Sequence, residues 1–237
     1  MNPDISQPTE WDRECMAWHE AGHAVCSMLL PEREKVLRVS IEPGDEAFGF
    51  MQAAHGRNHN GTLVSMRSAI ATELAGMLSE RMFLRRTTTS GGADLCAAYS
   101  MARDMVVRFG MGRRTGLACP GHASDGERAD FAFRNAQRVE ADIRDIIRSS
   151  RKSAESTLSG NQVLVRRIAL GLLEKKTLDS EALETMRNTT QVKSRDRPQE
   201  GESVWFLLTV FLLFAILVVG CIVLVSKQVS FLITGDL

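Results

Sequence analysis

The sequence carries no net charge, because 29 lysines and arginines balance 29 aspartates and glutamates. Nucleic acid normally selects a basic surface, so we expect no nucleic-acid partner. The five cysteines form no CxxC pair and are odd in number, which indicates a reducing compartment rather than a disulfide framework. They are Cys15, Cys26, Cys96, Cys119 and Cys221.

Two further motifs are missing. The first residues, MNPDISQPTEW, have neither the basic start nor the apolar run of a signal peptide, so we expect no export by that route. No glycine-rich stretch is followed by Lys-Ser or Lys-Thr. Without such a P-loop we expect no ATPase motor in these residues.

One long apolar run is present near the C-terminus. Val204 to Val225 comprises 22 residues without a charge, and at about 1.5 Å per residue such a helix matches the thickness of a bilayer core. We therefore predict a single transmembrane helix at 203–226, which anchors the chain to a membrane and leaves a short tail at 227–237. More cations precede the run than follow it, which predicts a cytoplasmic domain (Lys193, Arg195 and Arg197 against Lys227).

The sequence His19-Glu20-Ala21-Gly22-His23 is the HExxH pattern of zinc hydrolases. On a helix both imidazoles share one face, so they can bind one metal ion while Glu20 lies beside it as a base. A catalytic zinc site needs a third protein ligand and an open position for water. The motif thus predicts one Zn²⁺ per chain and a third ligand from elsewhere.

An ordinary amphipathic helix with chance histidines is the alternative interpretation of this motif. Apolar residues from Met16 to Leu29 recur at helical spacing, and Pro31 follows them. The motif is therefore expected on a helix.

The pattern along the chain predicts a mainly helical domain with a small β ribbon. Strands are expected at Val36–Ile41 and Phe48–Met51. Helices are expected over 63–84, 94–109, 127–153, 163–174 and 180–186, and the Ala75-Gly76 pair suits a close helix approach. We assign 1–10 to a polar N-terminal segment, 11–187 to the domain and 188–202 to a polar linker.

Four segments resemble the peptidase domain of the FtsH family of membrane-bound zinc proteases. They occur in the family's order and read AWHEAGHAV, TTTSGGADL, RFGMG and LLEKKTLDSEAL, within Trp11 to Arg187. The resemblance implies a helical zinc metallopeptidase. It also implies a contrast, since proteins of this family carry N-terminal membrane spans and an ATPase domain before the peptidase.

In the family, an aspartate in a TTGxxxDL loop completes the zinc site, and that position falls on Asp94. Local sequence alone favours an N-cap role for Asp94, but together with HExxH we interpret it as the third ligand. Glu80 matches a family position near the metal, so either a hydrogen bond to a ligand histidine or a plain surface carboxylate is expected. His55 and His59 have ligand spacing, but they lie in a polar stretch and are interpreted as loop histidines.

These observations favour a membrane-anchored zinc endopeptidase that acts on unfolded or flexible protein segments. His19, His23 and Asp94 would bind the metal, and Glu20 would act as general base. An extended substrate could add to the ribbon edge at Phe48, Gly49, Phe50 and Met51. The alternative is a non-catalytic adaptor of an ATPase-bearing protease complex, and a structural membrane protein with a chance motif is a remote third. As partners we expect either an ATPase-bearing protease or further copies of this chain in a homo-oligomer.

Overall fold

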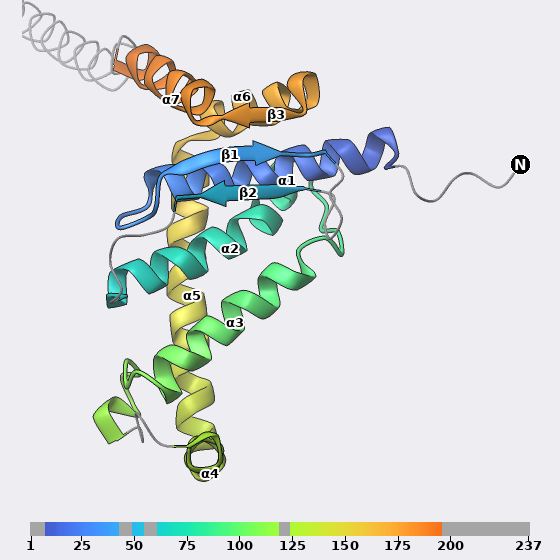
Figure 1. Cartoon of the computed structure of the whole chain (residues 1–237). Coiled ribbons are helices and arrows are strands. Elements are labelled where there is room, and N and C mark those ends of the chain that lie inside the picture. Colours follow the sequence, from blue (N-terminus) through green and yellow to red (C-terminus); the bar gives the residue numbers. More distant parts are fainter. Residues whose placement is uncertain (1–7, 43–48, 55–60, 119–123, 196–237) are drawn as a thin grey trace, which may run out of the picture. The chain divides into compact units, whose positions relative to one another are not determined.

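The computed structural model describes residues 8–42, 49–54, 61–118 and 124–195. This part of the chain is mainly helical with a small sheet, as the sequence predicts (Figure 1). In chain order its elements are α1 (Glu10–Leu29), β1 (Val36–Ser40), β2 (Phe50–Ala53), α2 (Leu63–Phe83), α3 (Gly92–Val107), the 3₁₀ turn η1 (Gly116–Ala118), α4 (Asp125–Arg134), α5 (Ala136–Gly160), α6 (Gln162–Lys175), β3 (Thr177–Asp179) and α7 (Ser180–Arg195).

The sheet is antiparallel, with the strand order β2-β1-β3. Buried Val39 in the central strand pairs with Met51 on one side and with Leu178 on the other. The predicted ribbon is therefore confirmed, although β2 begins at Phe50 and Phe48 lies outside the described residues. The sequence did not predict β3, because three residues are too few to establish an alternating pattern.

Helices α1 and α2 form the framework of the main core. Each begins with a capping box, at Thr9 and at Thr62, which satisfies free N–H groups of the first turn. The two helices touch backbone to backbone, since a Cβ on Gly22 would lie 2.4 Å from the carbonyl oxygen of Ala75. The predicted close approach at the Ala75-Gly76 pair is thus confirmed, and it brings α2 against the HExxH segment.

A second core cluster joins α2, α3 and α5 through buried side chains that include Ile70, Met105 and Ile143. The prediction of one helix over 127–153 is wrong, because the chain breaks between α4 and α5. Asn135 leaves the helical conformation there, with φ −112° and ψ 20°, and its side-chain amide donates to the Phe131 carbonyl. A residue that caps its own helix in this way does not disturb the apolar spacing on which the prediction relied.

Asp142 of α5 holds the segment before η1. This carboxylate is buried and accepts hydrogen bonds from the backbone N–H groups of Arg114 and Thr115, each at 2.9 Å, and from the Thr115 hydroxyl. The Arg114 guanidinium lies 3.0 Å from it. Burial acts in the opposite direction, but these hydrogen bonds prevail and lower the pKa of Asp142.

The C-terminal part departs from the expected pattern, because α7 continues past Met186 to Arg195, into the segment assigned to a linker. The chain divides into two compact units, Met1–Asn188 and Thr189–Leu237. Among the described residues, no helix combines the length and apolar character needed to cross a membrane. The predicted transmembrane helix at 203–226 lies outside these residues and stays a prediction.

Candidate metal centre

Three residues that the sequence singles out lie side by side on α1. His19, Glu20 and His23 are all buried, with 6–7% of each residue exposed. The Nε2 atoms of the two histidines are 2.9 Å apart, as expected for residues one helical turn from each other on one face. The predicted helix around the motif is confirmed.

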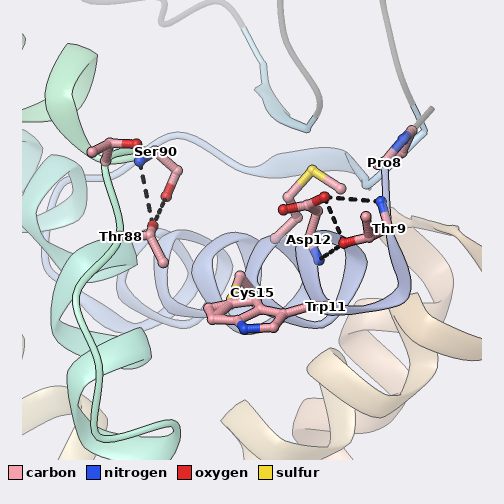
Figure 2. Close-up of a pocket in the computed structure, with 9 residues that line it drawn as sticks. Pro8, Thr9, Trp11, Asp12, Cys15, Thr88 and Ser90 are labelled. Atoms are coloured by element: carbon pink, nitrogen blue, oxygen red, sulfur yellow. Dashed lines mark hydrogen bonds between the residues drawn. The ribbon is translucent and has the colours of Figure 1, made fainter. Parts of the chain in front are cut away.

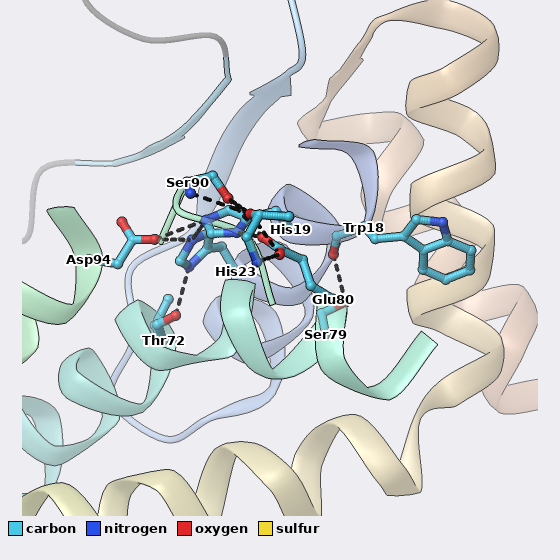
Figure 3. Close-up of polar contacts among 9 residues, drawn as sticks. Trp18, His19, His23, Thr72, Ser79, Glu80, Ser90 and Asp94 are labelled. Carbon is cyan, nitrogen blue, oxygen red and sulfur yellow. Dashed lines mark hydrogen bonds and ion pairs between the residues drawn. The ribbon is translucent and has the colours of Figure 1, made fainter. Parts of the chain in front are cut away.

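Asp94 comes from the first turn of α3 and meets both histidines (Figure 3). Its Oδ2 lies 2.9 Å from His19 Nε2 and 3.3 Å from His23 Nε2. The N-cap interpretation of Asp94 is wrong, because the N-cap of α3 is Gly91 and no side chain caps that helix. The aspartate side chain is therefore free to turn toward the imidazoles.

The second nitrogen of each imidazole is held by an acceptor. His19 Nδ1 lies 2.6 Å from Glu80 Oε1, and His23 Nδ1 lies 2.7 Å from the carbonyl oxygen of Thr72. A carbonyl accepts and never donates, so His23 carries its proton on Nδ1, and an ionised Glu80 requires the same of His19. In the neutral rings both Nε2 atoms then present lone pairs to Asp94 and to each other.

Glu80 is fully buried and has four donors around it. Besides His19, it accepts hydrogen bonds from the N–H and hydroxyl of Thr88 at 3.0 and 2.8 Å and from the Ser90 hydroxyl at 2.9 Å. Burial opposes ionisation, but these hydrogen bonds outweigh it and lower the pKa of Glu80. Glu80 is thus no surface carboxylate, and it ties the loop before α3 to the His19 ring.

These contacts fit a metal ion. Two imidazole nitrogens and a carboxylate oxygen lie within 4.8 Å of one another, and such a concentration of lone pairs requires a positive charge among them. Donors of a tetrahedral zinc site with bonds of about 2.0–2.1 Å lie about 3.3 Å apart, close to the separations found here. Without a metal, a proton on His19 can supply this positive charge. Burial lowers the pKa of His19, but hydrogen bonds to Asp94 and Glu80 outweigh burial and raise the pKa to about 9.

Glu20 faces a cavity of about 280 Å³ that opens beside the cluster. Burial raises the pKa of Glu20 above its ordinary value, although the two histidines act against this. Gly49, Phe50 and Met51 line the same cavity, and a Cβ on Gly49 would lie 2.9 Å from Glu20 Oε1. The predicted substrate edge thus borders the candidate site as far as it is described.

Sequence reasoning missed several residues of the site. Gly76 of α2 packs against both rings, and a Cβ there would lie 2.5 Å from His19 Nε2 and 2.6 Å from His23 Nε2. Thr72 contributes through its backbone carbonyl, which no sequence pattern reveals. Thr88 and Ser90 belong to the TTTSGGADL segment, in which the sequence predicts a role for Asp94 only. His55 and His59 lie outside the described residues.

A buried His-Glu-x-x-His helix with an aspartate turned toward both histidines, inside a mainly helical domain, defines a candidate metallohydrolase. The chain belongs to peptidase family M41, whose family model matches residues 7–186. The resemblance to FtsH-type peptidases that its motifs suggest is thereby confirmed.

Curated relatives are similar over most of this chain. It is 30% identical over 203 residues to the ATP-dependent zinc metalloprotease FtsH of Rubrobacter xylanophilus, an alignment that covers 80% of this chain and 31% of that protein. It is 31% identical over 193 residues to the ATP-dependent zinc metalloprotease FtsH 2 of Sphaerobacter thermophilus, with 81% and 29% covered. The chain thus spans about a third of the length of these relatives or less.

Proposed function

We propose that this chain is a zinc-dependent endopeptidase. The observation that carries the proposal is the convergence of His19 Nε2, His23 Nε2 and Asp94 Oδ2 within 4.8 Å, next to the buried carboxylate of Glu20. Membership of peptidase family M41 and the zinc metalloproteases among the relatives support it.

His19, His23 and Asp94 would hold one zinc ion. Zinc in such a site supplies a water of lowered pKa and polarises the carbonyl of the scissile peptide bond. Glu80 and the Thr72 carbonyl fix the orientation of the two rings, since each accepts the Nδ1 proton and leaves Nε2 directed at the cluster.

Glu20 would act as general base and then as general acid. Its position on α1, between the two histidines and facing the cavity, suits it to take a proton from the attacking water. The same carboxyl group would return a proton to the leaving amine. These steps use groups of this domain alone, so we propose that hydrolysis itself does not require ATP.

The substrate would bind as an extended strand along β2. This strand has one neighbour among the described strands, β1, so its other edge is available to a peptide. Phe50 and Met51 belong to this strand, Gly49 directly precedes it, and all three line the cavity. Only an unfolded or flexible segment can adopt that conformation, which is why we propose protein substrates of this kind.

We also propose that the chain acts at a membrane, anchored by the helix predicted at 203–226, with the peptidase domain on the cytoplasmic side. The uncharged apolar run supports the anchor. We propose that an ATPase-bearing protease delivers the substrate, because the relatives are described as ATP-dependent. Assembly of copies of this chain into a homo-oligomer is the alternative partnership.

Cleavage of an unfolded protein by the zinc-loaded chain tests the function. We expect wild-type cleavage that a chelator abolishes, and a rate for Glu20→Gln that is about 10²–10⁴-fold lower. Glu14→Gln is a matched control on the same helix, outside the residues that line the cavity. One zinc per chain without cleavage by any form would reject the peptidase and favour the adaptor.

A further inference from the structure

A second cavity of about 520 Å³ lies beside the metal centre and has no role in the proposed catalytic steps. Figure 2 shows it between the N-terminal part of α1 and the loop that precedes α3. Trp11 and Cys15 line it from the helix, and Thr88 to Ser90 line it from the loop.

This cavity is adjacent to the candidate active site. Met16 of α1 and Ser90 of the loop line both cavities. Asp12 and Met16 lie on the same face of α1 as His19, which follows them along the helix. At about 1.5 Å per residue, they are displaced from His19 by roughly 4–10 Å along the helix axis.

The lining is suited to an apolar guest. Pro8, Trp11, Cys15 and Met16 supply carbon and sulfur surface, and burial raises the pKa of the Cys15 thiol to about 12, which keeps it uncharged. Trp11 is 42% exposed although the Arg86 guanidinium lies 5.6 Å from the centre of its ring, so an incoming side chain can still cover part of the indole.

Four of the polar residues around the cavity, Thr9, Asp12, Thr88 and Ser90, already have hydrogen-bond partners. The Asp12 carboxylate accepts hydrogen bonds from the N–H and the hydroxyl of Thr9, at 2.8 and 2.6 Å. The hydroxyls of Thr88 and Ser90 donate to Glu80. An apolar guest leaves every one of these hydrogen bonds intact.

We propose that this cavity binds a large apolar side chain of the peptide substrate, two or three residues from the scissile bond. An extended peptide advances about 3.3 Å per residue, so that spacing matches the displacement of the cavity from His19. The inference rests on the proposed peptidase function, because adjacency to the site at His19 and Glu20 is what identifies the guest as substrate.

Paired peptides test the inference on the zinc-loaded full chain. Each pair differs only by Phe or Ala, placed two or three residues to either side of the cleaved bond. On one side we expect the Phe peptide to be preferred by about tenfold in kcat/KM, because burying a large apolar side chain is favourable. Thr89→Trp, which fills the cavity from its exposed loop, should remove most of this preference.

Thr87→Trp is the matched control, since Thr87 is an exposed residue of the same loop that does not line the cavity. It should keep the wild-type preference. An equal rate for Phe and Ala peptides at every position, or a preference that Thr89→Trp leaves unchanged, would overturn the proposal. Zinc content measured on each variant shows whether the metal centre is intact.

Binding separates this proposal from the peptidase function. Fluorescence anisotropy of labelled peptides on the zinc-loaded Glu20→Gln chain should show the same preference for Phe, again lost in Thr89→Trp. If no form cleaves peptides but this preference appears, the peptidase function fails and the binding cavity stands. If Thr89→Trp instead alters self-association in sedimentation and leaves peptide binding unchanged, a second copy occupies the cavity and the proposal is wrong.

Discussion

The Nε2 atoms of His19 and His23 lie 2.9 Å apart. In the neutral state each ring carries one proton, and it lies on Nδ1, where it is donated to Glu80 or to the Thr72 carbonyl, away from the other ring. Two lone pairs at that distance repel each other unless a proton or a metal cation lies between them. The fold imposes this arrangement through α2, because Thr72 and Glu80 hold the outer nitrogens and Gly76 allows the helix to approach the rings.

Metal binding should therefore stabilise the folded chain. At a zinc concentration 100 times the dissociation constant, we expect about 2.7 kcal/mol of added stability, which a chelator reverses. Thermal unfolding with and without zinc measures it. His23→Ala should lose the effect, whereas His59→Ala, a histidine interpreted as part of a polar loop, should keep it. Equal loss in both variants would argue against the assigned ligands.

Gly76→Ala should damage the centre although it replaces none of the proposed ligands. The new Cβ would lie 2.5–2.6 Å from the two Nε2 atoms, so the rings must move and zinc affinity should fall. Overpacking of this kind typically costs about 1–3 kcal/mol of folding free energy. Gly160→Ala is the control, because a Cβ there meets nothing within 4 Å. Titration with a competing zinc chelator checks the result, and wild-type affinity in Gly76→Ala would contradict it.

Glu80→Gln should weaken zinc binding by about 10–100-fold, as loss of a carboxylate behind a ligand histidine usually does. The amide nitrogen would also face hydroxyl and N–H donors that need an acceptor. Ser90→Ala removes one hydrogen bond to Glu80 and should cause a smaller loss. The same chelator competition gives both values, and a larger effect for Ser90→Ala would show that the loop, rather than Glu80, positions His19.

The buried Asp142 predicts a dependence of stability on pH. The pKa of Asp142 is lower in the folded chain than the unfolded value of about 3.9. Its contribution to folding stability is therefore complete above about pH 3.9 and is lost as the pH falls from there toward the folded pKa. Urea unfolding between about pH 3 and pH 6 should show a steeper loss for wild type than for Asp142→Asn. Asp145→Asn, a more exposed partner of Arg114, should resemble wild type; identical slopes in all three would remove Asp142 as the cause.

Much of the site was predictable because its key residues follow local rules. The spacing of His19 and His23 fixes their common face on any helix. The resemblance of the TTTSGGADL segment to the FtsH family predicts Asp94 as the third ligand. The break at Asn135, the short strand β3 and the carbonyl of Thr72 were not predictable in this way. Their roles depend on a side chain that caps its own helix, on pairing between distant strands and on a backbone atom, none of which alters a hydrophobic period.

The cavity next to the metal centre is a further feature that only the folded chain reveals. Trp11 and Thr89 are far apart in sequence, and it is the packing of the loop against α1 that places them on one cavity. Its proposed use is tested by the peptide pairs described above.

The anomalous signal at the zinc absorption edge, measured on crystals of the zinc-loaded chain, tests the metal centre most directly. We expect one peak per chain, about 2.0–2.1 Å from His19 Nε2, His23 Nε2 and a carboxylate oxygen of Asp94. Absence of a peak there, or a peak at His55 and His59 instead, would contradict the zinc peptidase proposed here.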